Sequence, residues 1–163
     1  MMRVAALALM LLLAACGLQP MYGGGGSGHV ASGLTTIQVA PIPERAGWLV
    51  RNALVDRLGG EPGNASYRLD VELDDNITAF GIRGDSAATR ERRTLRARYR
   101  LVELKTGAVV LDATAGSDAG IDIVSSEYAT VAAEQTAQER LADGIADQMV
   151  SRLALFIRRS GEQ

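Results

Sequence analysis

The sequence has 163 residues, which is enough for one domain with a substantial core. Although 47% of the residues are hydrophobic, only 4% are aromatic, so leucine, valine, isoleucine and alanine must build that core. The formal net charge is -2, which argues against sequence-independent binding of nucleic acid, because such binding depends on a strongly basic surface.

The N-terminus has the pattern of a secretory signal peptide. Arg3 supplies a positive charge, residues 4–13 form an unbroken apolar run, and small residues follow up to Cys16, the one cysteine of the sequence. The run is shorter than the about 20 apolar residues that cross a bilayer. Its end, Leu13-Ala14-Ala15-Cys16, matches the bacterial lipobox, in which the thiol receives diacylglycerol before cleavage. We therefore expect residues 1–15 to be removed and Cys16 to be lipidated.

Lipidation of Cys16 would hold the protein on a membrane. Each buried methylene contributes about 0.8 kcal/mol, so two or more acyl chains, such as palmitate, give durable anchoring. Gly17 follows the cysteine in place of the aspartate that retains many lipoproteins at the inner membrane, so the sequence favours the outer membrane, on the side facing the periplasm. The alternative is an incidental thiol beside an ordinary signal cleavage site.

Residues 16–33 are expected to be the lipidated cysteine and a glycine-rich tether. The run of glycines at residues 23–28 resists regular structure. A glycine-rich loop can also cradle a phosphate, but here no strand precedes it and no lysine follows at the required spacing. His29, the single histidine, has no second metal ligand or catalytic partner nearby in the sequence. The pattern therefore favours a linker and predicts no metal site.

Residues 34–160 are predicted to form a single domain with two helices. A short strand of mixed character over residues 34–40 ends at Pro41-Ile42-Pro43, and Pro43 with Glu44 is a typical helix opening. This first helix ends at Gly59-Gly60. A long helix is expected from about Ser126 to Arg158. The apolar faces of the two helices are carried by Val50, Leu54, Leu58, Leu141, Ile145, Met149, Leu153 and Phe156.

Strict alternation of apolar and polar residues predicts strands between the two helices. In residues 67–74 the polar side chains are mostly acidic, whereas in residues 95–101 they are all arginine. Antiparallel pairing would set these opposite charges across from each other on the solvent face. A turn at residues 105–107 leads into a third strand over residues 109–115. We therefore predict an α+β fold with a four-stranded, mostly antiparallel sheet and two helices on one face, in the order strand-helix-strand-strand-strand-helix.

Short motifs throughout the mature chain resemble those of a known family, the lipopolysaccharide-assembly lipoproteins LptE in their alphaproteobacterial form. The motifs are Cys16-Gly17-Leu18-Gln19-Pro20-Met21-Tyr22-Gly23, Arg45-Ala46-Gly47 with Leu49, Arg51-Asn52-Ala53-Leu54, Tyr67-Arg68-Leu69, Leu141-Ala142 and Arg152-Leu153. The resemblance implies a protein that is not an enzyme and needs no cofactor. It implies a one-to-one complex with the outer-membrane barrel LptD, in which the lipoprotein plugs the lumen, assists assembly of the barrel and binds lipopolysaccharide.

One segment between the charged strands is a candidate binding site. Residues 81–93 are longer than a usual hairpin connection and contain four arginines, Arg83, Arg90, Arg92 and Arg93. Guanidinium groups bind phosphates through planar paired contacts, so these arginines are candidates for contact with lipopolysaccharide. The alternative is a solvated loop whose charges continue the basic strand.

Two other classes of function are compatible with parts of the sequence. The first is an unrelated outer-membrane lipoprotein that binds peptidoglycan or another periplasmic partner through the same sheet. The second is an enzyme, but the sequence shows no paired histidines, no nucleophile elbow and no metal-spaced ligands. The sequence therefore favours the translocon subunit and names no catalytic residue.

Overall fold

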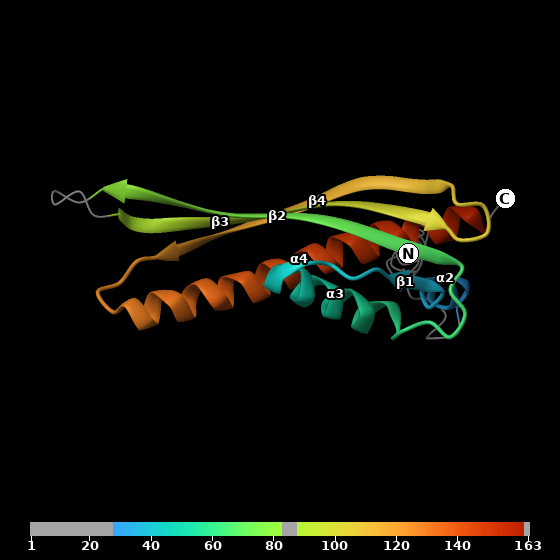
Figure 1. Cartoon of the computed structure of the whole chain (residues 1–163), viewed down its shortest axis with the longest axis horizontal. Coiled ribbons are helices and arrows are strands. Elements are labelled where there is room, and N and C mark those ends of the chain that lie inside the picture. Colours follow the sequence, from blue (N-terminus) through green and yellow to red (C-terminus); the bar gives the residue numbers. More distant parts are fainter. Residues whose placement is uncertain (1–27, 83–87, 162–163) are drawn as a thin grey trace, which may run out of the picture.

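A computed structural model describes residues 28–82 and 88–161, and it places a single sheet against a layer of helices (Figure 1). This arrangement confirms the predicted α+β class. The elements in chain order are α2 (His29–Leu34), β1 (Ile37–Val39), α3 (Glu44–Leu58), β2 (Tyr67–Ile82), β3 (Ala88–Glu103), β4 (Val109–Asp122) and α4 (Glu127–Ser160).

The four strands lie in the order β1-β2-β3-β4. The short β1 runs parallel to β2, with Ile37 opposite Tyr67, and α3 provides the crossover between them. The pairs β2–β3 and β3–β4 are antiparallel, so the sheet is mostly antiparallel as predicted. The edges of the sheet are therefore β4 on one side and, on the other, β1 with the part of β2 that β1 does not reach.

The strands β2 and β3 are longer than the sequence pattern indicated. Each has 16 residues, and their pairing continues to Ile82 and Ala88. The predicted loop over residues 81–93 is therefore wrong, since residues 88–93 belong to β3. Alternation in the sequence is interrupted at Asp75, which places a carboxylate at an inward-facing position of β2. Main-chain pairing does not require apolar side chains, so the ladder continues.

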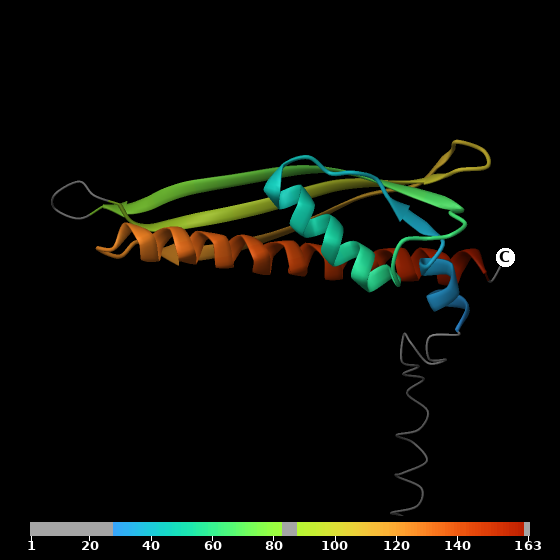
Figure 2. The same ribbon diagram turned by 60° about the horizontal axis from the view of Figure 1, so that its bottom comes forward.

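Both long helices cover the same face of the sheet (Figure 2). The 34-residue α4 extends along the sheet for about 51 Å at the usual helical rise, and α3 crosses it. Each contributes one apolar stripe to a single core between helices and sheet. The largest fully buried side chains of this core are Tyr99, Ile37, Leu54, Leu58, Leu69, Leu95, Leu101, Ile145, Met149, Leu153 and Val50.

The ends of the long helices follow the signals in the sequence. At the end of α3, Gly59 adopts a left-handed conformation with φ of 98°, which a side chain would disfavour, and its N–H donates to the Val55 carbonyl. At the start of α4, the Ser126 hydroxyl accepts a hydrogen bond of 3.4 Å from the Ala129 N–H. None of the helices in the described part of the chain combines the length and apolar character needed to span a membrane.

The short helix α2 was not expected. Its residues were assigned to the tether and to the first strand, but His29–Leu34 form a helix that contacts α4 and buries Leu34. Gly33 packs against Ile157, close to the end of α4. The chain therefore enters the domain beside the C-terminal end of α4, and the far end of the β2–β3 hairpin lies at the opposite end of the molecule (Figure 2).

Candidate functional site

The sheet has one face against the helices and one face that no element in the described ranges covers, which we call the open face (Figure 1). Side chains alternate between the two faces along each strand. In β3 the odd-numbered Leu95, Ala97 and Tyr99 are buried, so the even-numbered residues lie on the open face. These include five arginines, which we call the arginine row: Arg90, Arg92, Arg96, Arg98 and Arg100.

Three arginines of the row make ion pairs on the open face. Arg100 pairs with Glu72 of β2 at 2.8 Å, whereas Arg98 and Arg90 pair with Asp112 and Asp122 of β4 at 2.9 and 2.7 Å. The hydrogen bonds from Arg98 hold the pKa of Asp112 below its ordinary value. The predicted facing of acidic and basic side chains is therefore confirmed, although the arginines reach to both neighbouring strands. Exposed pairs of this kind stabilise little and chiefly fix the register.

Arg92 has no carboxylate partner among the described residues. Its guanidinium carbon lies 5.6 Å from the centre of the Phe80 ring, which is a cation–π distance. Both side chains border a hollow of about 350 Å³ on the open face near the hairpin end, lined by Phe80, Arg90, Arg92, Asp118, Gly120 and Asp122. Arg92 is thus a cation beside an aromatic ring, with its donors available to an external anion.

Arg96 is the second arginine of the row for which the described residues provide no ion pair. Its Nη1 donates to the carbonyls of Leu95 and Ser117, at 3.3 and 3.2 Å, so the side chain lies flat over β4. A Cβ atom on Gly116 would lie 2.7 Å from Arg96 Cδ, and only glycine leaves room for this contact. Sequence reasoning did not single out Arg96, and the signal that could have found it is the glycine opposite it in β4.

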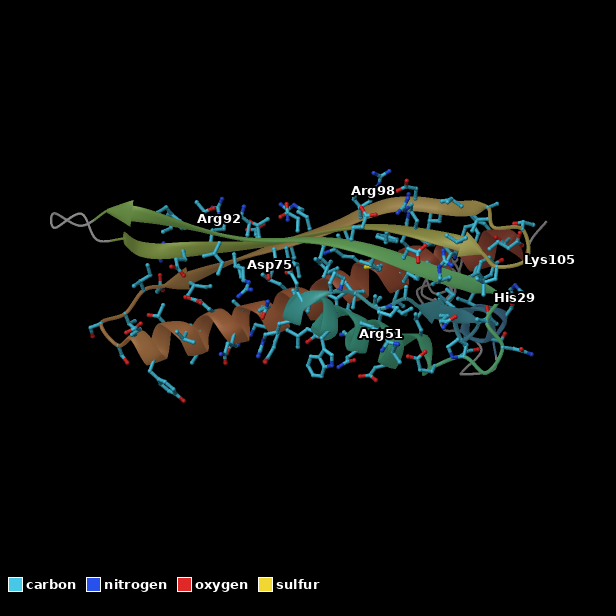
Figure 3. The ribbon with its side chains drawn as sticks, viewed as in Figure 1. His29, Arg51, Asp75, Arg92, Arg98 and Lys105 are labelled. Atoms are coloured by element: carbon cyan, nitrogen blue, oxygen red, sulfur yellow. The ribbon has the colours of Figure 1, made fainter. Side chains whose placement is uncertain are left out.

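Arg93 points to the other side of the sheet, as its odd number requires. Its Nε and Nη2 donate to the two carboxylate oxygens of Asp75 at 2.8 and 2.6 Å, and only 12–13% of either side chain is exposed. Gln138 of α4 also donates to Asp75, at 2.9 Å, and accepts from Arg45. Together these bonds hold the pKa of Asp75 below its ordinary value, with Arg93 as the largest cause. Figure 3 shows Asp75 between the sheet and the helices, whereas Arg92 lies on the open face.

The candidate arginines are therefore not one cluster. Arg90 and Arg92 lie together on the open face, and Arg93 joins a sheet to a helix beneath it. Arg83 and Cys16 lie outside the described residues. The described ranges contain no group of three or more residues that could hold a metal ion, and His29 lies against Gly161.

Glu91 is a neighbour of Arg93 on the helix side with a different character. Its Oε2 is buried and has no hydrogen-bond partner in residues 28–82 or 88–161. Burial, and secondarily the carboxylate of Glu134 on α4, raise the pKa of Glu91 above its ordinary value. Polar side chains thus continue the helix–sheet contact where the apolar core ends.

Comparison with known proteins gives consistent results. A family model described as LptE, lipopolysaccharide-assembly, matches residues 34–153. A crystal structure of a lipoprotein from Caulobacter crescentus CB15 is similar, with a TM-score of 0.68 and 31% identity over 83% of this chain and 98% of that one. The rare lipoprotein B from Shewanella oneidensis shares the fold, with a TM-score of 0.60, 9% identity and coverage of 78% and 98%. No curated protein matches the sequence.

Proposed function

Because this chain belongs to the LptE family of lipopolysaccharide-assembly proteins, we propose that it is the lipoprotein subunit of the outer-membrane lipopolysaccharide translocon. In this role it occupies the lumen of an LptD-type barrel in a one-to-one complex, assists assembly of that barrel and binds lipopolysaccharide. Lipid on Cys16 attaches it to the outer membrane, on the side facing the periplasm. The match over residues 34–153 supports the assembly role. The LptD-type barrel as partner and lipopolysaccharide as ligand are proposed here.

The surface of the domain suits a polar barrel lumen. The open face is lined by charged side chains from three strands, most of which are paired with one another. The lumen of an outer-membrane barrel is polar, so such a face can lie against its wall with few unpaired charges to accommodate. Co-purification of the chain with a large outer-membrane barrel after solubilisation tests this part. If another kind of protein or peptidoglycan were the major partner, this part of the proposal would be wrong.

The observation that carries the lipopolysaccharide contact is the position of Arg92. Its guanidinium lies beside Phe80 with no carboxylate partner in the described residues, and Arg90 is next to it. We assign phosphate contact to Arg92 first and Arg90 second, with Arg83 added on sequence grounds alone. Arg93 has its donors engaged by Asp75 and the Glu134 carbonyl, so it serves the domain's own structure.

Purified lipopolysaccharide is the probe for this contact. Arg92→Ala should weaken its binding at least about tenfold, since a hydrogen-bonded charge contact is worth about 1.5–3 kcal/mol. Arg98→Ala is the matched control, because it lies on the same strand and face but its guanidinium is paired with Asp112. Equal binding by wild type and Arg92→Ala would overturn the assignment while leaving the barrel complex untouched.

A further inference from the structure

The strand β4 is a free edge of the sheet. Its outward main-chain groups belong to the even-numbered residues, because the N–H and C=O of Gly116 point away from β3, and successive residues alternate. No hydrogen bond within residues 28–82 or 88–161 engages the outward N–H of Thr114 or Asp118. Both residues are exposed. The edge therefore presents unused donors and acceptors at strand spacing.

A single side chain imitates a neighbouring strand at the middle of this edge. The Gly116 N–H donates to Gln148 Oε1 at 3.3 Å, and Gln148 Nε2 donates to the Gly116 carbonyl at 3.2 Å. This pair of bonds is the one that a single residue of an antiparallel fifth strand would make at the same position, with its own C=O and N–H. The Gln148 side chain comes from the exposed side of α4 and can swing away without disturbing the core.

Hollows flank the edge on the side of α4. One of about 430 Å³ is lined by Tyr99, Asp112, Ala113, Thr114, Gln148 and Arg152. A second of about 420 Å³ continues along α4 from Asp147 to Leu155. Gln148 also borders the hollow of about 710 Å³ on the open face. All three hollows share Gln148 as a lining residue, and we call them, together with the outer edge of β4, the β4 groove. Its floor is a strand edge, which fits an extended chain.

The opposite edge of the sheet lacks these properties. Past the short β1, the edge of β2 has Asp70, Glu72 and Asp74 on its open side and Asp75 pointing inward. Inward-pointing charge is a common protection of edge strands against pairing. In β4 the inward side chains between Ala113 and Ala119 are small and uncharged, and proline is absent. The edge open to pairing is therefore β4.

We propose that the β4 groove binds an extended segment of the barrel partner, which adds to β4 as a fifth strand after displacing Gln148. This inference rests on the proposed function for the identity of the partner. The charges beside the edge define the segment. Asp118 on the open face and Arg152 on the helix side have no ion pair in the described ranges. A segment with basic residues toward the open face and acidic residues toward α4 complements both.

Proline substitution tests the strand addition without damage to the sheet. Thr114→Pro removes an N–H that points away from β3, and edge strands tolerate proline at such positions. Thr114→Pro should weaken association with the barrel at least about fivefold. The variant loses the hydrogen bond from the Thr114 N–H, and the proline ring obstructs the approach of the added strand. Thr114→Val keeps the N–H and should bind like wild type. Gln148→Ala frees the Gly116 groups and should bind more tightly than wild type.

Three readouts separate the outcomes. The urea midpoint of each free variant should match that of wild type, which establishes that the fold is kept. Hydrogen exchange of the Thr114 and Asp118 amides should slow in the barrel complex.

Equal association of Thr114→Pro and Thr114→Val, or unchanged exchange at these amides, would overturn the fifth strand while the complex itself stands. Absence of any barrel complex with wild type would instead overturn the proposed function. Concentration-dependent protection in the free protein would assign the groove to a second copy of this chain and also overturn the inference.

Discussion

At the scale of single residues, the polar contact between sheet and helices is built around Asp75. This carboxylate accepts two hydrogen bonds from Arg93 and one from Gln138, across elements far apart in the sequence. A largely buried pair of charges stabilises only when its remaining hydrogen bonds are also made, and here they are. Sequence patterns could not identify this group. Arg92 and Arg93 are adjacent residues of the same type. Because successive side chains of a strand lie on opposite faces, the sequence alone does not tell which of the two faces the helices unless the register is known.

Replacement of Arg93 should destabilise the domain. Arg93→Met leaves Asp75 with Gln138 as its remaining partner, so the free energy of unfolding should fall by about 2–3 kcal/mol, less than for a fully buried pair. The matched control Arg98→Met breaks an exposed pair and should leave stability unchanged. Urea denaturation at pH 7 measures both. Equal losses for the two variants would contradict the distinction between the faces.

Glu91 should make the stability of the domain depend on pH in the opposite direction from Asp75. Its pKa is raised above the ordinary 4.5, so the folded state favours the protonated form, and this contribution is lost as pH rises through the folded-state pKa. The contribution of Asp75, whose pKa is lowered, is instead lost as pH falls below its ordinary 3.8. Glu91→Gln should therefore be more stable than wild type at pH 7, with the difference shrinking towards pH 4. Urea midpoints at the two values measure this, and a difference independent of pH would refute it.

At the scale of elements, α4 has two unlike halves. Its buried residues start at Ala137, and the preceding residues from Glu127 have none. The sequence predicted the bounds of both long helices well, because caps and apolar stripes are local signals. It underestimated β2 and β3, since the extension of their ladder depends on main-chain pairing with residues distant in the sequence. The parallel placement of β1 was likewise not accessible from local patterns.

Hydrogen exchange should show this difference along α4. Helical amides in residues 131–136 should exchange at least about tenfold faster than those in residues 141–157, because little apolar contact opposes local opening there. Exchange of the free domain, followed by NMR, measures the gradient. Uniform protection along the helix would mean that the polar contacts around Asp75 hold its first half as firmly as the core holds the second.

At the scale of the whole molecule, the position of α2 relates the domain to its expected anchor. The described chain begins beside the C-terminal end of α4, at the opposite end from the β2–β3 hairpin and Arg92 (Figures 2 and 3). Residues 17–27 can reach at most about 40 Å when extended, which is less than the length of a 16-residue strand. A lipid anchor at Cys16 would therefore keep the α2 end of the domain close to the membrane, whereas the hairpin end could lie farther away.

Removal of the anchor should separate attachment from assembly. Cys16→Ala should abolish lipid attachment. Because the proposed function assigns the barrel contacts to the folded domain, the complex should still form. Membrane fractionation in cells with and without the barrel measures the first effect, and co-purification with the barrel measures the second. Loss of the complex in this variant would show that the lipid takes part in barrel association itself.

The paired charges of the open face have a consequence for how quickly partners meet. Arg68 and the arginine row are matched in number by Asp70, Glu72, Asp74, Asp112, Asp118 and Asp122 on the same face. Alternating charges of equal number cancel within a short distance, so this face projects almost no Coulomb field into solution. This face then does not attract a charged partner over distances beyond the Debye length of about 8 Å. We expect its association rate constant to be that of an uncharged surface. Ionic strength should therefore leave the association rate at this face nearly constant.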